Sequence, residues 1–227
     1  MKVAIHQPNF LPWLGYFNKI KEVDIFVILD NVQYVKGTVA NRNEIKNKKN
    51  EKQYITTPVK LSKGYNQNYN QIEIDYSTKW VAKHLNLFKD SYYKAPFFDE
   101  IFTFIEAIYL KKHLVLSELN IDIILLLINK LEISTEIQIT SNINKHFGAK
   151  NDQNIAICNY FKADIYLSGT GAKKYNIEEL YNSHEIIIEY QNFTHPTYPQ
   201  LHGEFISHLS IIDALFNVGF EGVKKLI

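Results

Sequence analysis

The sequence has very few of the features that would place a protein outside the cell or across a membrane. Of its 227 residues one, Cys158, is a cysteine, so no internal disulfide can form and we expect a reducing environment. The longest apolar stretch, residues 121–128, contains Asp122 and is far shorter than a membrane span. The apolar run after Lys2 is three residues long, which does not fit a signal peptide. We therefore expect a cytoplasmic protein with no membrane span.

The chain also has almost no net charge. The 25 basic and 24 acidic residues leave a formal net charge of +1, which gives no electrostatic footprint for nucleic acid, so we do not expect DNA as a partner. By contrast, 46% of the residues are hydrophobic, enough to form a core and to exclude general disorder. Aromatic residues make up 14% and include 15 tyrosines, which either line a sugar or nucleoside pocket or pack in the core.

The hydrophobic pattern predicts an α/β fold, because short apolar runs alternate with segments of helical spacing. We expect an open, largely parallel sheet of about six strands with helices on both faces, a Rossmann-like three-layer arrangement. Within a single domain over 1–227, residues 79–133 form a helical insertion or subregion. Expected strands cover 3–5, 25–29, 54–59, 136–141, 164–168 and 185–190, and residues 36–53 are expected to form an exposed hairpin or loop with strand content at 39–45. Expected helices cover 13–21, 80–88, 97–116, 119–131, 154–161, 177–181 and 211–218.

The first expected strand ends at His6-Gln7-Pro8, which we take as the leading candidate site. Pro8 cannot extend the interior of a sheet, and open α/β sheets hold ligands at the carboxyl edge of their strands. Histidine titrates near neutral pH without further tuning, so His6 is a candidate general base with Gln7 as a hydrogen-bonding partner. The alternative is that His6 only caps the strand.

A carboxylate closes the second expected strand. Asp30 would lie near His6 if these strands are neighbours, and it could then orient the imidazole or bind a substrate hydroxyl or amine. Gln33 follows three residues later. The alternative is a local turn that Asp30 forms with Asn31.

Arg42 lies between Asn41 and Asn43 in a polar, basic segment. Its planar guanidinium recognises carboxylate or phosphate, so an arginine flanked by amides suits a nucleotide diphosphate or a sugar. The alternation of a strand would turn Arg42 to the face opposite both asparagines. The alternative is an ordinary exposed basic loop.

A glycine-containing turn follows the expected strand at 164–168. In Ser168-Gly169-Thr170-Gly171 the glycines would let backbone N–H groups face an anion. The segment lacks the spacing of the common phosphate-binding motifs. A tight turn without a ligand is therefore the alternative.

Two loops complete the set of candidates. Residues 62–71 are rich in asparagine and glutamine and could form a mobile lid. Residues 194–202 carry Tyr198 and Gln200 beside two prolines, and the alternative there is a rigid connection that packs aromatic rings. The histidines form no zinc signature, so we expect no metal site, and Cys158 lies in an apolar segment without an adjacent base, which favours buried packing.

The segment from His6 to Lys19, HQPNFLPWLGYFNK, resembles the signature of the WbqC-like protein family. Trp13 and Lys19 of this segment join the candidate substrate-binding residues. The likeness continues in several further segments, which extend it over the whole chain: 24–33, 41–43, 166–169, 198–200 and 209–213, with Phe216, Asn217 and Gly219.

The resemblance implies a transferase of bacterial surface-polysaccharide, or O-antigen, biosynthesis, which adds an acyl or aminoacyl group to the amine of a nucleotide-linked amino sugar. In this hypothesis His6 removes a proton from the amine and Asp30 orients the ring or the substrate. Arg42 and the turn at 168–171 hold the diphosphate. Four amide side chains bind the sugar hydroxyls: Gln7, Gln33, Asn41 and Asn43.

Two alternatives stay open, namely nucleotidyl or other group transfer to a sugar, and a non-catalytic partner that binds a sugar nucleotide. We expect no built-in cofactor. The acyl donor is a coenzyme A thioester, an acyl carrier protein or an aminoacyl-tRNA, and neither the sugar nor the oligomeric state follows from the sequence. The catalytic hypothesis requires that His6, Asp30 and Arg42 converge on a single cleft.

Overall fold

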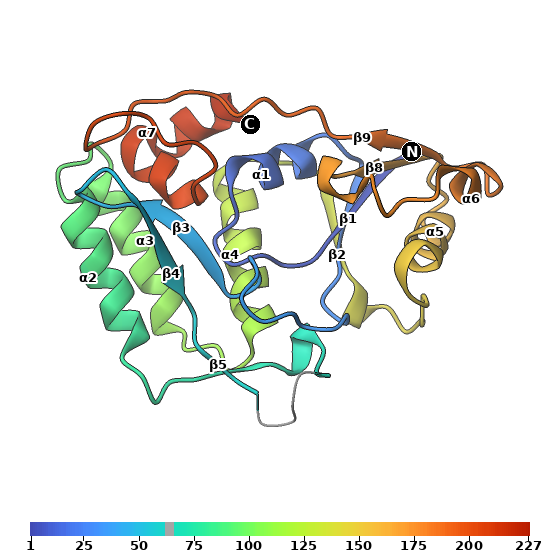
Figure 1. Cartoon of the computed structure of the whole chain (residues 1–227), viewed down its shortest axis with the longest axis horizontal. Helices are drawn as coiled ribbons and strands as arrows, with labels where there is room; N and C mark the ends of the chain where they lie inside the picture. The colour runs from blue at the N-terminus through green and yellow to red at the C-terminus, as the bar shows by residue number, and fades with distance from the viewer. Residues whose placement is uncertain (62–65) are drawn as a thin grey trace.

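A computed structural model of the chain describes residues 1–61 and 66–227, and its centre is a parallel β-sheet (Figure 1). The sheet has five strands in the order β7-β2-β1-β8-β9, and every neighbouring pair is parallel. Its strands are β1 (Lys2–His6), β2 (Ile25–Ile28), β7 (Glu136–Ile139), β8 (Ile165–Ser168) and β9 (Ile187–Tyr190). The short apolar runs of the sequence form these strands because a strand covered on both faces needs no polar alternation.

Helices cover both faces of the sheet, and alternate residues of each strand point to different faces. In β1, Ala4 joins the apolar cluster that contains α1 (Leu14–Lys21), α4 (Leu116–Lys130) and α7 (Ile211–Leu226). Its neighbours Val3 and Ile5 join a second cluster that contains α5 and α6. These two helices span Lys150–Tyr160 and Glu178–Asn182.

The strand order creates a point at which the chain changes direction. After β1 the chain adds β2 and then β7 on one side, and it later adds β8 and β9 on the other side. The helix after β1, α1, lies on one face, and the helix after β8, α6, lies on the other. The chain therefore diverges beyond the adjacent carboxyl ends of β1 and β8, which is where ligands bind in sheets of this kind.

The expected strand at 54–59 lies outside the five-stranded sheet. Residues of β3 (Arg42–Lys46) and β4 (Lys52–Thr56) pair antiparallel as a hairpin, and β5 (Val59–Lys60) pairs with β6 (Glu73–Ile74). Asn50, with φ of +62°, closes the hairpin. In β4 exposed residues alternate with less exposed ones. This pattern is typical of a strand with one face in solvent and not of a buried central strand.

Three helices occupy most of residues 79–133. They are α2 (Trp80–Tyr92), α3 (Phe98–Leu110) and α4, and Figure 1 shows α2 and α3 side by side, far from α5 and α6. The apolar cluster of the α1 face continues into them. Their assignment as an insertion within a single domain stays a prediction. No helix in the described ranges is both long and apolar enough to cross a bilayer.

Several boundaries differ from the expected ones. Helix α3 ends at Leu110 and not at 116, and α7 continues past Gly219, whose φ of +68° interrupts the helical geometry. Ser210 caps α7 as expected, because its side chain accepts a hydrogen bond from the backbone N–H of Ile212. In the expected lid, residues 62–65 lie outside the described residues, and Tyr69–Gln71 form a short 3₁₀ turn.

A buried histidine of α2 makes the stability of the fold dependent on pH. The Nε2 atom of His84 lies 3.1 Å from both N and O of Thr56, and burial lowers the pKa of His84 to about 4. Unfolded histidine titrates at about 6.5, so the unfolded state binds the extra proton between these values. The stabilisation is thus complete above pH 6.5 and is lost as the pH falls toward 4.

We therefore expect His84 to account for a loss of about 2 to 3 kcal/mol in unfolding free energy between about pH 7 and 4.5. Urea unfolding at both pH values measures it. The variant His84→Gln should show a smaller pH dependence than the wild-type protein, by that amount. Identical pH dependence in the two proteins would contradict the assignment.

Candidate functional site

A cavity of about 270 Å³ opens at the carboxyl ends of β1 and β8, where the chain changes direction. We call it the His6 cavity. Strand β1 contributes His6, and α1 contributes Tyr16 and Lys19. Its lining residues are His6, Trp13, Gly15, Tyr16, Lys19, Gly169, Thr170, Gly171, Gln191, Asn192 and Phe193.

The imidazole of His6 is held in one orientation and one tautomer. Its Nδ1 atom lies 2.9 Å from the carbonyl oxygen of Gln7; because a carbonyl only accepts, Nδ1 carries the proton and Nε2 keeps a free electron pair. The Tyr16 ring packs edge-on against it at 5.0 Å between centroids. Burial, and then the charge of Lys19, lowers the pKa of His6 to about 4.

The ring of His6 is therefore neutral at physiological pH, and Nε2 is a hydrogen-bond acceptor. The expectation that this histidine titrates near neutral pH without tuning is wrong, because the site removes it from water and places an ammonium group beside it.

Lys19 is buried without a counter-charge. Its side chain is 3% exposed, and its Nζ atom has the carbonyl oxygen of Ile5 as a partner at 3.5 Å. Within the described ranges no carboxylate pairs with it. Burial lowers the pKa of Lys19 to about 8.

Trp13 forms the wall between this cavity and a second one. A Cβ atom added at Gly15 would lie 2.3 Å from the indole ring of Trp13, so the glycine lets the ring lie flat on the start of α1. On its other side the ring stacks on His208 at 5.2 Å and on His195 at 6.1 Å between centroids. The neighbouring cavity shares Trp13 with the His6 cavity.

This second cavity, the Arg42 cavity, has a volume of about 370 Å³. Arg42 is the single arginine of the chain, and its guanidinium carbon lies 4.6 Å from the centre of the Tyr54 ring. In the described part of the chain it forms no ion pair. The lining residues are Asn9, Trp13, Gly37, Thr38, Val39, Arg42, Asn43, Glu44, Tyr54 and His208.

The two asparagines beside Arg42 serve mainly to hold the backbone. Asn43 donates to the carbonyl oxygen of Leu11 at 2.7 Å, and Asn41 donates to that of Thr57 at 2.9 Å. Asn43 still borders the Arg42 cavity, but Asn41 does not. Asn9, which the sequence analysis missed, is 5% exposed and lines the cavity, and its Oδ1 atom has no hydrogen-bond partner among residues 1–61 and 66–227.

Asp30 and His6 line different cavities, although β1 and β2 are neighbours as the prediction required. The Oδ1 atom of Asp30 accepts hydrogen bonds from Thr140 Oγ1 at 3.0 Å and from the backbone N–H of Ser141 at 2.9 Å. It thus ties the end of β2 to the segment after β7, and it borders a separate cavity of about 440 Å³, the Asp30 cavity. The predicted role of Asp30 in orienting the imidazole is not supported by this geometry.

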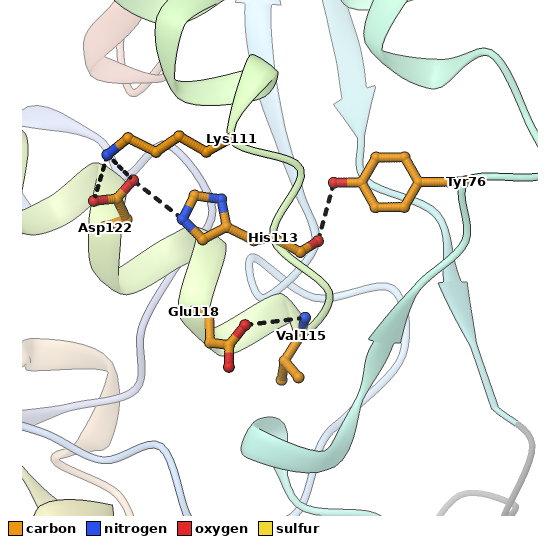
Figure 2. A network of polar contacts seen from close by, with 6 residues as sticks. All are labelled: Tyr76, Lys111, His113, Val115, Glu118 and Asp122. Carbon is orange, nitrogen blue, oxygen red and sulfur yellow. Dashed lines mark hydrogen bonds and ion pairs between the residues drawn. The ribbon is translucent and has the colours of Figure 1, made fainter.

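The other acidic side chains of the Asp30 cavity are also engaged within the protein (Figure 2). Asp122 accepts two hydrogen bonds from Lys111, at 2.7 and 3.0 Å, and lies 3.2 Å from Nε2 of His113. Glu118 accepts from the backbone N–H of Val115 at 3.4 Å. These contacts fix the connection between α3 and α4.

Gln7 and Gln33 line a fourth cavity of about 590 Å³, the Gln7 cavity, on the α5 side of β1. Tyr69 donates a hydrogen bond to Oε1 of Gln7 at 3.0 Å, and Gln33 donates to Asn66 at 3.4 Å. Gln7 directly follows β1, at the carboxyl edge of the sheet, and Gln33 lies in the loop after β2. Their binding of sugar hydroxyls stays a prediction.

The sequence profile of the WbqC-like protein family matches residues 7–225. The chain belongs to this family. It is also 35% identical over 227 residues to the uncharacterized protein Rv1507c of Mycobacterium tuberculosis (strain ATCC 25618 / H37Rv), a match that covers 99% of this chain and 97% of the relative. No solved structure matches the chain.

In this WbqC-like protein the C-terminal motif residues form a buried network and not a ligand pocket. Asp213 is fully buried and accepts hydrogen bonds from the hydroxyl groups of Tyr92, at 2.7 Å, and Tyr198, at 2.9 Å, and from Gln200 at 2.9 Å. Gln200 also accepts from the buried ammonium of Lys46 at 3.3 Å. The substrate-binding role predicted for Tyr198 and Gln200 is not supported, because neither borders any of the four cavities.

The residues of the turn after β8 have two different roles, one structural and one in lining the His6 cavity. Ser168 is fully buried and accepts a hydrogen bond from Asn176 at 3.0 Å. Gly169 and Gly171 line the His6 cavity, as do Trp13 and Lys19. The WbqC-like protein therefore brings five of the predicted residues together with Tyr16 and Gln191, which the sequence analysis missed.

The predicted convergence of three side chains is wrong in this WbqC-like protein, so the catalytic hypothesis fails in the form that needs His6, Asp30 and Arg42 in one cleft. His6, Asp30 and Arg42 border three different cavities, although the His6 cavity and the Arg42 cavity are neighbours through Trp13.

The sequence could have identified Gln191 as a site residue, because it directly follows the expected strand at 185–190 and so lies at the carboxyl edge of the sheet. It donates to the carbonyl oxygen of Gly15 at 2.8 Å and fixes the start of α1.

Proposed function

We propose that this WbqC-like protein is a cytoplasmic transferase of bacterial surface-polysaccharide biosynthesis that acylates the amine of a nucleotide-linked amino sugar. The observation that carries the proposal is the pair of cavities on the two sides of Trp13. One holds a free imidazole acceptor in His6, and the other holds a fixed positive charge in Arg42. A ligand with a reactive sugar and a diphosphate needs these two environments side by side.

The two cavities divide the substrate between them. The His6 cavity, at about 270 Å³, suits the amino sugar. The Arg42 guanidinium, already packed on Tyr54, suits the diphosphate through its planar pair of N–H donors. Trp13 would then lie against the sugar ring, an apolar contact that aromatic rings often make in such pockets.

His6 performs the proton transfer in this proposal. The nitrogen of the sugar amine attacks the acyl carbonyl, and the new C–N bond leaves a positively charged nitrogen with two acidic protons, one of which must be removed. That proton passes to the free electron pair on Nε2 of His6. When the C–S or C–O bond to the donor breaks, the leaving sulfur or oxygen takes the proton, which restores the neutral ring.

Mass spectrometry tests this function against its alternatives. The protein is incubated with nucleotide amino sugars, with and without a coenzyme A thioester, an acyl carrier protein thioester or an aminoacyl-tRNA. We expect a sugar nucleotide whose mass has increased by one acyl or aminoacyl group, with one class of donor only. Addition of a nucleotidyl group would favour the alternative transferase. Binding without any product would favour the non-catalytic partner.

Gly171 provides a test of where the substrate binds. A Cβ atom at this position meets no protein atom within 4 Å, and its φ does not require glycine. We expect Gly171→Val to change the unfolding free energy by less than about 0.5 kcal/mol, as is typical of a surface change, and yet to weaken binding of the sugar nucleotide at least tenfold by narrowing the cavity. Calorimetric titration and thermal unfolding measure both effects. Unchanged affinity would place the ligand elsewhere.

A further inference from the structure

Two lysines are buried among the described residues, Lys19 and Lys46, and they differ in what surrounds their charges. Lys46 is 1% exposed, and its ammonium donates to Gln200 and to the carbonyl oxygen of Glu204, with the carboxylate of Asp213 nearby. Lys19 is 3% exposed and has a single carbonyl partner at 3.5 Å. A buried charge without compensation is costly, so the environment of Lys19 is incomplete in a way that the environment of Lys46 is not.

The geometry points to an anionic ligand group, a phosphate or a carboxylate, bound by Lys19 in the His6 cavity. Lys19 lines the cavity wall together with His6, and α1 fixes it in place. An anion there would supply the missing counter-charge, and its other oxygen atoms would face the turn at 169–171, where open space surrounds both glycines. The inference names the chemical class of substrate for the site of the proposed function, on which it rests.

The groups that face Lys19 support an anion and not a second cation. His6, on β1, is neutral above about pH 5 because its pKa lies at about 4. Tyr16, on α1, stays protonated because burial raises its pKa. The lining residues from the β8 and β9 ends, Gly169–Gly171 and Gln191–Phe193, carry no ionisable side chain. Lys19 is thus the one charged side chain among the lining residues of this cavity.

Calorimetric titration without any acyl donor tests the inference, so that it can be read even if no transfer occurs. Two pairs of probes distinguish the source of the anion. UDP is compared with uridine for phosphate, and a preference here that depends on Lys19 would move the diphosphate from Arg42 into the His6 cavity. UDP-glucuronate is compared with UDP-glucose for a sugar carboxylate, which leaves the diphosphate on Arg42. The variant is Lys19→Met, which keeps the length and apolar stem of the side chain. The control is Lys21→Met, an exposed lysine of the same helix.

We expect the member of one pair that carries the additional anionic group to bind the wild-type protein about 10- to 100-fold more tightly than the member without it, as for a hydrogen bond between charged groups. Lys19→Met should abolish that difference, and Lys21→Met should retain it. The preference should also weaken as the pH rises through 8 in the wild-type protein, since Lys19 has a pKa of about 8.

A second readout separates lost binding from lost folding. Since the buried charge of Lys19 is uncompensated without ligand, Lys19→Met should unfold at an equal or higher temperature than the wild-type protein. Three results would overturn the inference: equal affinity of wild-type protein and Lys19→Met for every probe, no binding of UDP or of UDP-glucuronate, or tighter binding of uridine than of UDP together with tighter binding of UDP-glucose than of UDP-glucuronate. Loss of acyl transfer with the anion preference intact would overturn the proposed function alone.

Discussion

Replacing His6 with alanine is expected to lower the rate of acyl transfer by about 10²- to 10⁴-fold, the usual contribution of a general base. The substitution removes the Nε2 acceptor and leaves the backbone of β1 intact. The ring also packs against Tyr16, so some loss of stability accompanies the loss of rate. Initial rates at saturating sugar nucleotide, followed by mass spectrometry, give the comparison.

The dependence of the rate on pH distinguishes a role for His6 from a general effect on structure. In the wild-type protein the rate of acyl transfer should stay constant as the pH falls below neutral, and should decrease only toward pH 4, because the pKa of His6 is about 4. His184→Ala serves as the control, since His184 is exposed and remote in the chain. Full activity in His6→Ala, or an equal loss in His184→Ala, would exclude His6 as the base.

Replacing Asp213 with alanine is expected to cost roughly 3 to 5 kcal/mol of unfolding free energy, the scale of breaking a buried charged network. The substitution leaves the donors of Tyr92, Tyr198 and Gln200 without their acceptor. It also removes the carboxylate near the buried ammonium of Lys46. The network joins α2, α7 and the hairpin strand β3, so its loss affects the whole α1 face.

Urea unfolding followed by circular dichroism measures this effect. Asp152→Ala, an exposed carboxylate on α5, should change the unfolding free energy by less than about 0.5 kcal/mol. Asp213→Asn should fall between the two, because it keeps an acceptor oxygen and loses the charge. A loss below about 1 kcal/mol in Asp213→Ala would show that the network contributes little, and would reopen a ligand-binding role for Tyr198 and Gln200.

The sequence was sufficient to locate the edge of the sheet where the His6 cavity lies. Unbroken apolar runs at 3–5 and 25–29 can only be buried strands, and His6 and Pro8 end the first of them. The turn at 168–171 follows a third such run. Parallel pairing of β1 with β8 then places these ends side by side, which explains why His6, Gly169 and Gly171 share one cavity.

The order of the strands in the sheet could not be predicted from the sequence, and this order accounts for the wrong prediction at Asp30. Asp30 follows β2, but β7 pairs with β2 on the side away from β8. The carboxylate is therefore satisfied by Thr140 and Ser141 after β7. Apolar patterning gives the length of a strand and not its neighbours, so the sequence could not show this partner, which lies 110 residues away.

Long-range polar contacts explain the errors at Tyr198 and Gln200 for the same reason. Their acceptor, Asp213, and the acceptor's other donor, Tyr92, come from separate helices. Lys19 is different, because the sequence did contain its signal. It occupies the position before Ile20 on the apolar face of α1, one turn after Tyr16, and a lysine within an apolar helix face indicates a buried charge.

A crystal structure with a bound nucleotide amino sugar tests the central claim most directly. We predict the sugar in the His6 cavity, with its amine within hydrogen-bonding distance of Nε2 of His6, and the diphosphate on Arg42 beyond Trp13. A sugar nucleotide bound in the Asp30 cavity or the Gln7 cavity, with His6 and Arg42 untouched, would contradict the claim.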